Sequence, residues 1–573
     1  MRINQIIIHN FRSIIDVTIE AHDYLMLVGA NNSGKSNVIN ALRAFYDDLT
    51  WSNNDFPKRG AADDESWIKI TFALTDEEWS GLAPNYKGKQ NNNTLIVKRY
   101  FKGAKVKPKQ SNIYAIVDGD EGDDLFYGAK NVSTAKLGNI VYIPALTTPN
   151  EQMKTSGSSP FRNMLNFMLK KIVQKSEAYA HIEAAFKELN DEANKENGFL
   201  SEIATPINKA LSEWDIKLDM SVDPVSTDDI SKGLIKPSFV DIVLGEDGFE
   251  LERYGHGFQR SVIYELIKLA PTFKDEKKNE KKEFNPDFDL ILFEEPEAFL
   301  HPAQQEIMAL NLRMLGNTNN QQVFITTHSP IFVGKNSYQI PQIVRLIKVD
   351  GVSKFFQLEQ SDWDDVFSRN RDYLKLLQDY INDPSVKEEQ KKDARKLVKY
   401  ASQEEISLQH EKFRYQLWLD SGKASMFFAD RVLLVEGATE KALFNYLLSN
   451  QWYDLAQYRI FVVDAFGKYN FHRFMSLFES FGIYHGIMFD DDDSKNHHDV
   501  TNQFILRRKN SFTLADPVLF QGCLETSLGL TEPGRGDQKP LDILRAISDD
   551  KISDEHIDCL RKQFCSALDI SDD

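Results

Sequence analysis

Short apolar runs alternate with polar residues over the first part of the chain. Side chains of an extended segment point alternately to opposite faces, so this alternation predicts β-strands. The runs that fit lie before about residue 145: Ile6–Ile8, Val17–Ile19, Tyr24–Val28, Ile68–Phe72, Thr94–Val97 and Ile140–Ile143. We therefore expect a strand-rich N-terminal region.

From about residue 150 to 217 the apolar positions recur at helical spacing, which predicts a helical insertion. Strands resume at Phe239–Leu244, and two strand–helix units follow around Leu290–Phe293 and Val323–Thr327. The mixed-charge run at 274–283 is interpreted as a solvated loop. Together these elements predict one α/β unit over residues 1–345.

The rest of the chain changes character twice. A polar, helical pattern from about 365 to 420 is typical of a connector, so we predict a helical linker over 346–427. Strands and helices then alternate again, with strands predicted at Arg431–Val435, Arg459–Val463 and Gly486–Phe489. This pattern predicts a second α/β domain over 428–573.

Composition limits the class of protein. The chain has 573 residues, 42% of them hydrophobic and 27% charged, which excludes a disordered or low-complexity protein. It has no apolar run of membrane-spanning length, no signal peptide at its start, and too few cysteines for a disulfide framework (Cys523, Cys559, Cys565), so we expect a cytoplasmic protein without membrane contact. The net charge of -18 by itself argues against nucleic-acid binding.

Residues 29–36 read GANNSGKS and satisfy the phosphate-loop pattern G-x-x-x-x-G-K-[ST]. The backbone N–H groups of such a loop surround phosphate oxygens at a helix N-terminus. A plain glycine-rich turn is the alternative, but the apolar strand before the loop and the helical spacing after it favour a nucleotide site. The predicted ATP contacts are Gly29, Asn32, Gly34, Lys35, Ser36 and Asn37, with Lys35 neutralising phosphates and Ser36 binding Mg²⁺.

Two later strands end in polar residues suited to the same site. The segment DLILFEEPE places Glu294 where a carboxylate would hold Mg²⁺ and Glu295 where one would polarise the attacking water. The segment VFITTHSP places His328 near the γ-phosphate. Residues 255–260, GHGFQR, open a predicted helix and offer a second anion-binding N-terminus with Gly257 and Gln259.

A second constellation is purely acidic. Glu436 follows an apolar strand, and Glu440 lies one helical turn later on the same side. Asp490 and Asp492 follow another apolar strand and share a face, since alternate residues of an extended segment do. An oxygen-only cluster suits Mg²⁺ or Mn²⁺ better than zinc. A solvated acidic loop is the alternative for the four aspartates at 490–493, but two carboxylate sets capping strands of one domain favour a metal site.

The N-terminal motifs, taken in order, resemble those of the ABC-type ATPases of the recombination and repair group over residues 1–345. The segments that match are HNFRS, GANNSGKSN, GHGFQR, FEEPEAFLHP and TTHSP. In that family the signature segment of one head completes the nucleotide site of another. The resemblance therefore implies that Gly257 and Gln259 act in trans, within a homodimer or a higher homo-oligomer.

The acidic constellation resembles a Toprim domain, a Rossmann-like metal-binding module, and this match implies a triad of Glu436, Asp490 and Asp492. An ABC-type ATPase head with a helical, dimerising insertion followed by Toprim is the architecture of nucleases of the OLD (overcoming lysogenization defect) family. Further landmarks imply that Asp464 and Glu525 are additional metal-site carboxylates and that Lys539 stabilises the pentavalent phosphate.

The resulting hypothesis is an ATP-hydrolysing, Mg²⁺-dependent DNA endonuclease, in which two ions about 3.5–4 Å apart serve phosphodiester hydrolysis. The resemblance suggests antiphage defence, with a helicase or a reverse transcriptase and its DNA as partner. The basic runs 98–109 and 507–509 are candidate DNA contacts. The alternatives are a DNA-clamping repair-type ATPase that signals to a partner and has an inactive Toprim domain, and a transporter ATPase subunit.

Overall fold

The computed structural model describes most of both predicted α/β units. The described residues are 1–145 except 62, 90–91 and 130–135, then 176–193, 198–211 and 288–571 except 318–319, 335–336, 404–413, 416, 420–421, 493–496 and 532–537, with isolated positions elsewhere. The predictions for Phe239–Leu244, for Gly257 and Gln259 and for the run 274–283 lie outside the described residues.

The first sheet is antiparallel, with the strand order β2-β1-β4-β5-β6-β7. Its strands are β1 (Arg2–Phe11), β2 (Ile14–Glu20), β4 (Ser66–Ala73), β5 (Thr94–Lys102), β6 (Ile113–Val117) and β7 (Asp120–Leu125). The short helix α2 (Asp76–Gly81) follows β4. Four of these strands are those expected from the alternation, whereas β6 and β7 were not predicted.

The second sheet has the order β12-β11-β3-β10-β9-β8 and is parallel except for its edge strand β12. Its strands are β3 (Tyr24–Val28), β8 (Asn139–Ile143), β9 (Asp289–Glu294), β10 (Gln321–Thr327), β11 (Ile343–Val349) and β12 (Val352–Gln357). The helices that follow these strands are α1 (Lys35–Phe45), α9 (Pro302–Gly316) and α10 (Pro330–Gly334).

Both faces of the second sheet are buried. Leu25 and Leu27 of β3 belong to a core shared with the first sheet and α1. Met26 and Val28 point to the opposite face and belong to a core with α9 and α10. A strand covered on both faces is apolar at every position, which explains why Tyr24–Val28 is a continuous apolar run.

The second sheet extends past the boundary predicted at residue 345, because β11 and β12 form a hairpin where a helical linker was expected. Asp350 and Gly351 connect the two strands with φ angles of 52° and 87°. An Asp-Gly pair between alternating residues is a strong hairpin signal, since both turn positions require positive φ. The sequence thus contained a signal for this hairpin, although a helical linker was predicted there.

The C-terminal unit contains a parallel sheet with the order β14-β13-β15-β16. Its strands are β13 (Arg431–Val435), β14 (Ile460–Asp464), β15 (His485–Asp490) and β16 (Val518–Phe520). Its helices are α14 (Ala438–Asn450), α15 (Phe471–Ser480), α16 (His498–Leu506), α17 (Leu524–Ser527), α18 (Lys539–Ser548) and α19 (Asp554–Ala567). The three strands predicted here are all present.

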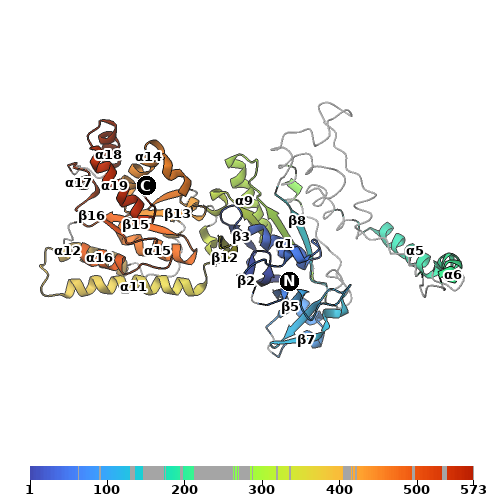
Figure 1. The fold of residues 1–573 in the computed structure, drawn as a ribbon. Coiled ribbons are helices and arrows are strands. Elements are labelled where there is room, and N and C mark those ends of the chain that lie inside the picture. Colours follow the sequence, from blue (N-terminus) through green and yellow to red (C-terminus); the bar gives the residue numbers. More distant parts are fainter. Residues whose placement is uncertain are drawn as a thin grey trace.

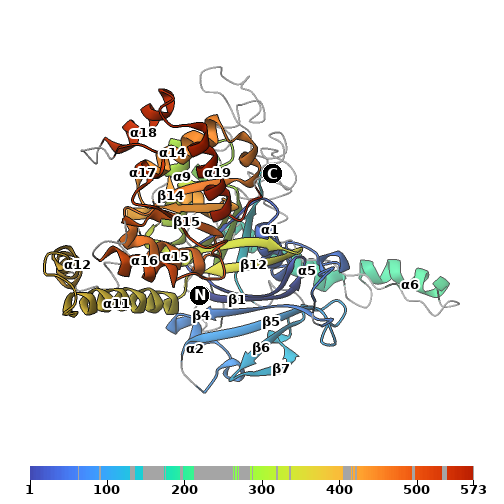
Figure 2. The same ribbon diagram turned by 60° about the vertical axis from the view of Figure 1, so that its left-hand side comes forward.

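The two units share a hydrophobic core. Val432 of β13 and Phe474 of α15 belong to the same cluster as Met26 and Phe332 of the N-terminal unit. The connector contributes α11 (Gln360–Asn382) and α12 (Lys391–Gln403), and α11 lies along α15 and α16 (Figures 1 and 2). The C-terminal unit is therefore packed directly against the N-terminal one.

Two helices are described within the predicted insertion, α5 (Glu177–Ala193) and α6 (Phe199–Leu211). Figure 1 shows both helices away from the sheets of the two units. Of the described helices, none has the length and apolarity needed to cross a membrane.

Candidate nucleotide and metal sites

The loop over residues 29–36, called the P-loop below, joins β3 to α1 and depends on two glycines. Gly29 has φ of 143° and Gly34 has φ of 110°, which L side chains rarely adopt. A Cβ at Gly29 would lie 2.2 Å from the main-chain oxygen of Leu346, and one at Gly34 would lie 2.1 Å from Ser353 Oγ. The β11–β12 hairpin thus packs tightly against the P-loop.

Two serines that were not predicted hold the P-loop in place. Ser353 Oγ donates to the main-chain oxygen of Ser33 at 2.7 Å and lies 2.7 Å from Ser13 Oγ. Asn37 donates through Nδ2 to Ser13 Oγ at 2.7 Å. Ser13 is part of the HNFRS segment, so the sequence offered a signal for it, but nothing local marked Ser353.

The ammonium of Lys35 lies inside the loop. Its Nζ donates to the main-chain oxygens of Gly29 at 3.0 Å and Ala30 at 2.9 Å. Burial lowers the pKa of Lys35 to about 8, and nearby carboxylates, with Glu295 the strongest, oppose that shift. The lysine therefore lies close to the acidic residues at the end of β9, as a phosphate-binding lysine must.

The register of the second sheet brings the predicted residues to one edge. Val28 at the end of β3 pairs with Thr327 of β10, and Thr326 pairs with Glu294 of β9. Glu294 Oε2 accepts a hydrogen bond from the Tyr142 hydroxyl at 3.0 Å. The other oxygen of Glu294, Oε1, is buried without a hydrogen-bond partner among the described residues.

Glu295 and His328 face each other across this edge, with 3.6 Å between Oε1 and Nε2. Burial lowers the pKa of His328 to about 4, and the charge of Lys35 adds to the effect, so the ring is neutral near pH 7. Glu297 was not predicted, although it belongs to the EEPE motif. Its Oε1 accepts from the main-chain N–H of His328 at 2.6 Å, and burial raises the pKa of this carboxyl group.

The oxygen atoms at this edge fit a magnesium-bound nucleotide. Glu294 Oε1 and Glu297 Oε2 are buried acceptors without partners in the described part of the chain. Buried carboxylate oxygens are costly to leave unsatisfied, and a cation with its bound waters would satisfy them. Ser36 is exposed at the start of α1, where its hydroxyl is free to serve as a further oxygen ligand.

The second group of predicted residues lies at the C-terminal ends of the parallel strands of the C-terminal unit, called the carboxylate edge below. Glu436 follows β13, Asp464 ends β14 and Asp490 ends β15, and the register pairs Val435 with Asp464. The first turn of α14 adds Glu440, whose Oε2 accepts from the main-chain N–H of Gly437 at 3.0 Å.

Three of these carboxyl groups repel one another. Burial raises the pKa of Asp490 to about 8, and the charges of Glu440 and Glu436 add to the shift. Burial also raises the pKa of Glu436 to about 7, and it raises the pKa of Glu440. Glu436 Oε2 is buried without a described hydrogen-bond partner. A divalent ion bound among these oxygens would offset the repulsion and favour the ionised carboxylates.

The other three acidic residues at this edge each pair with a lysine. Asp464 contacts Lys423 at 3.3 Å and Lys441 at 2.7 Å. Glu525 lies 3.4 Å from Lys539. Asp492 contacts Lys468 and lies 3.0 Å from His498 Nδ1. Within the described ranges, no three His, Cys, Asp or Glu side chains converge into a ready-made metal site.

Lys468 was not assigned a role from the sequence. Its ammonium is 1% exposed and donates to the main-chain oxygen of Asp490 at 2.7 Å and to the carboxylate of Asp492. Burial tends to raise the pKa of Asp492, but the hydrogen bonds from His498 and Lys468 hold it below its usual range. Asp492 is therefore an ionised acceptor held between one lysine and one histidine.

Several cations of the two basic runs that were predicted to contact DNA are paired with acidic side chains. Four cations of β5 and the following turn have acidic partners, namely Lys98 and Lys105 with Glu121, Arg99 with Asp47, and Lys102 with Asp64. Arg508 pairs with Asp372 and Lys509 with Asp516. DNA contact through either run stays a prediction.

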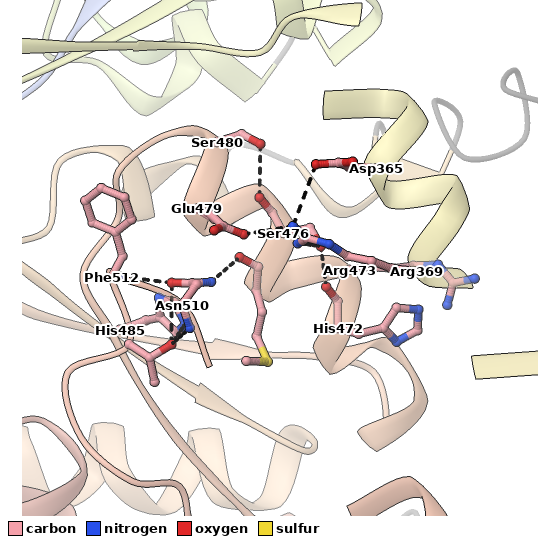
Figure 3. Close-up of polar contacts among 12 residues, drawn as sticks. Asp365, Arg369, His472, Arg473, Ser476, Glu479, Ser480, His485, Asn510 and Phe512 are labelled. Atoms are coloured by element: carbon pink, nitrogen blue, oxygen red, sulfur yellow. Dashed lines mark hydrogen bonds and ion pairs between the residues drawn. The ribbon is translucent and has the colours of Figure 1, made fainter. Parts of the chain in front are cut away.

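A cavity of about 460 Å³ lies where β11 and β12 meet α11 and α15. Arg369 of α11 lies at its wall and donates to Ser476 Oγ at 2.7 Å, with Glu479 at 3.1 Å (Figure 3). Burial raises the pKa of Asp362, which also lines the cavity. As far as the described residues show, none of the predicted site residues lines it, so the cavity is separate from both sites.

Comparison with known proteins matches both units. A family model described as AAA ATPase domain matches residues 1–164 and 85–333. A model described as overcoming lysogenization defect protein-like, TOPRIM domain, matches residues 427–492. These matches and the observed sheets confirm the predicted fold class, an α/β ATPase head followed by an α/β Toprim domain.

Two curated relatives are named as nucleases. The Old nuclease of Escherichia phage P2 is 26% identical over 348 residues, which cover 57% of this chain and 56% of that protein. Endonuclease GajA of Bacillus cereus (strain VD045) is 24% identical over 511 residues, which cover 86% of this chain and 75% of that protein. The solved structure of an SMC head bound to the C-terminal winged-helix domain of ScpA is 17% identical. The match covers 63% of this chain and 99% of that one, with a TM-score of 0.36.

Proposed function

Because the chain belongs to the AAA ATPase domain family and carries a TOPRIM domain of the overcoming-lysogenization-defect type, we propose that it is an ATP-hydrolysing, metal-dependent DNA endonuclease. One observation carries the proposal: a single chain places a P-loop with carboxylates at one sheet edge and mutually repelling carboxylates at another. Both curated relatives described above are named as nucleases.

At the P-loop, the proposed ATP contacts are those predicted from the sequence, with Lys35 beside the phosphates. Ser36 and Glu294 are the proposed Mg²⁺ ligands, because Glu294 keeps a buried oxygen free. Glu295 is proposed to orient the attacking water. The neutral ring of His328 lies 3.6 Å from it and can donate to or accept from the same water. Gly257 and Gln259 are proposed to complete this site in a second copy of the chain.

At the carboxylate edge, Glu436, Glu440 and Asp490 are the proposed metal ligands. A divalent ion bound there would lower the pKa of a water and polarise a phosphodiester. Lys539 is proposed to neutralise charge on the phosphate, since it already lies beside Glu525 at this edge. Asp464, Asp492 and Glu525 are paired with lysines. Each of them can bind the metal ion only after it gives up its lysine contact.

The proposed biological role is defence against phage, which the resemblance to nucleases of the OLD family suggests. The proposed substrate is DNA and the proposed assembly is a homodimer or a higher homo-oligomer. A helicase or a reverse transcriptase with its DNA is the proposed partner. Mg²⁺ is the proposed ion, with Mn²⁺ as a substitute of the same ligand preference.

The deciding experiment measures cleavage of plasmid and single-stranded DNA with Mg²⁺ or Mn²⁺, with and without ATP. Glu436→Gln and Asp490→Asn should abolish cutting, whereas Lys35→Ala should change only its dependence on ATP. Asp549→Asn is the matched control, because this carboxylate is 54% exposed and pairs with Lys551, which has no role in either proposed site. Cutting that survives Glu436→Gln and Asp490→Asn would refute the proposal.

A second candidate is a DNA-clamping ATPase that signals to a partner and has an inactive TOPRIM domain. The lysine contacts of Asp464, Asp492 and Glu525 favour it, since they neutralise half of the predicted metal-site carboxylates. Calorimetric titration of the nucleotide-free chain with Mn²⁺ separates the two. Saturable binding that is lost in Asp490→Asn supports the nuclease, and no binding supports the clamp.

A further inference from the structure

Lys468 is an ammonium group enclosed among oxygen acceptors. Its side chain is 1% exposed, and it donates to the main-chain oxygen of Asp490 at 2.7 Å, to the Asp492 carboxylate and to Asn502 Oδ1 at 3.4 Å. An ammonium removed from water is stable only where acceptors replace its hydration. Its position is thus fixed by the end of β15, the aspartate that follows and α16.

The backbone also anchors this lysine to a second strand end. Gly467 has φ of 101° and its N–H donates to the main-chain oxygen of Glu436 at 2.8 Å. The turn that carries Lys468 therefore touches the residue after β13, and its ammonium touches the last residue of β15. Lys468 is placed to set the geometry between Glu436 and the two aspartates.

The partners of the carboxylates divide them into two groups. Asp492 is held by Lys468 on one side and by His498 Nδ1 at 3.0 Å on the other. No ion pair joins the Glu436 or Asp490 carboxylate to a lysine ammonium among the described residues. The main-chain N–H of Lys468 hydrogen-bonds the Glu436 carboxyl group, and Glu436 Oε2 has no described hydrogen-bond partner. Asp490 Oδ1 instead accepts from the main-chain N–H of Leu524 at 2.9 Å.

Building on the proposed metal-dependent function, we propose that Lys468 is a positioning residue that reserves Asp492 as its own acceptor and leaves Glu436, Glu440 and Asp490 to take the divalent ion. Asp492 would have to leave its ion pair with the buried ammonium of Lys468 to become a ligand, and breaking that pair leaves the buried ammonium uncompensated. This differs from the sequence-based expectation, in which Asp492 shares the metal with Asp490.

The test is Mn²⁺ binding to the full-length, nucleotide-free chain, followed by electron paramagnetic resonance. Asp490→Asn should weaken binding by more than about 100-fold, while Asp492→Asn should weaken it by less than about threefold, below the usual effect of losing even an outer partner. In a Lys468→Met background Asp492 is released, so Asp492→Asn should there weaken binding by about tenfold.

Lys441→Met is the matched control, because it removes a lysine from the same edge that contacts Asp464 and not Asp492. The effect of Asp492→Asn should stay below about threefold in that background. Equal losses for Asp492→Asn and Asp490→Asn in the native background would overturn the role of Lys468 and leave the nuclease proposal intact. Absence of any Mn²⁺ binding and of any cleavage by the unmodified chain would overturn both. If Lys468→Met does not fold, the comparison of Asp490→Asn with Asp492→Asn in the native background still tests the proposal.

Discussion

The guanidinium of Arg345 donates a hydrogen bond of 2.6 Å to the main-chain oxygen of Gly482, and this contact joins the two halves of the molecule. Arg345 is in β11 and pairs with Val28, the residue before the P-loop. It also donates to Phe427 and Phe481 main-chain oxygens, each at 3.0 Å. Burial lowers the pKa of Arg345 to about 10, so it stays charged near pH 7. One buried cation thus links the nucleotide sheet to the TOPRIM domain.

Arg345→Met should destabilise the chain strongly, because it leaves buried carbonyl groups without a donor. Each orphaned group costs about 1–3 kcal/mol. Thermal unfolding followed by calorimetry should show a lower midpoint and separate transitions for the two units. Arg561→Met is the control, since its partner Asp454 is 55% exposed and surface pairs contribute about 0–1 kcal/mol. Equal effects of the two variants would contradict this account.

Gly34→Ala should abolish tight ATP binding for two separable reasons. The new Cβ would lie 2.1 Å from Ser353 Oγ, and φ of 110° is strained for alanine. Adding Ser353→Gly removes the steric clash but not the strain, so the double variant should bind ATP more tightly than Gly34→Ala and more weakly than Ser353→Gly alone, which accounts for the lost hydrogen bond to Ser33. Fluorescent-nucleotide titration measures both effects. Full recovery would show that backbone strain is negligible there.

Glu295→Gln should retain ATP binding while lowering its hydrolysis by about 10²–10⁴-fold, the usual contribution of a positioned general base. The amide keeps the size of the side chain but loses its basicity. Phosphate release measured beside nucleotide affinity checks this expectation. Glu306→Gln, on α9, serves as the control. A hydrolysis rate near that of the unmodified chain would exclude Glu295 as the group that activates water.

The C-terminal unit should lose stability as the pH falls from about 6.5 to 4. His485 is fully buried, and burial lowers its pKa to about 4, so the unfolded chain binds a proton in this window that the folded chain does not. Unfolding free energy therefore rises with pH there, by up to about 3 kcal/mol from this group. Denaturant unfolding of the unmodified chain and His485→Gln across pH 4–7 measures the difference. Parallel pH profiles would contradict the assignment to His485.

Local pattern was sufficient for the central strands. The runs Tyr24–Val28 and Arg431–Val435 are strands with the predicted bounds, because a strand buried on both faces is marked by its own apolar residues. The P-loop was equally readable, since Gly29 and Gly34 are required by backbone geometry and steric contact. By contrast, β12 and Ser353 were missed because residues 346–357 were assigned to a helical linker despite the Asp350-Gly351 turn signal.

The sequence by itself determined the two α/β units, the P-loop and the acidic residues that follow the strands, because each depends on residues that are neighbours in the chain. Only the tertiary structure decided which carboxylates are neutralised. Lys423 reaches Asp464 across 41 residues and Lys468 reaches Asp492 across 24, and no spacing rule relates such positions. Charge compensation depends on distance through space, which is set by how the strands and turns pack.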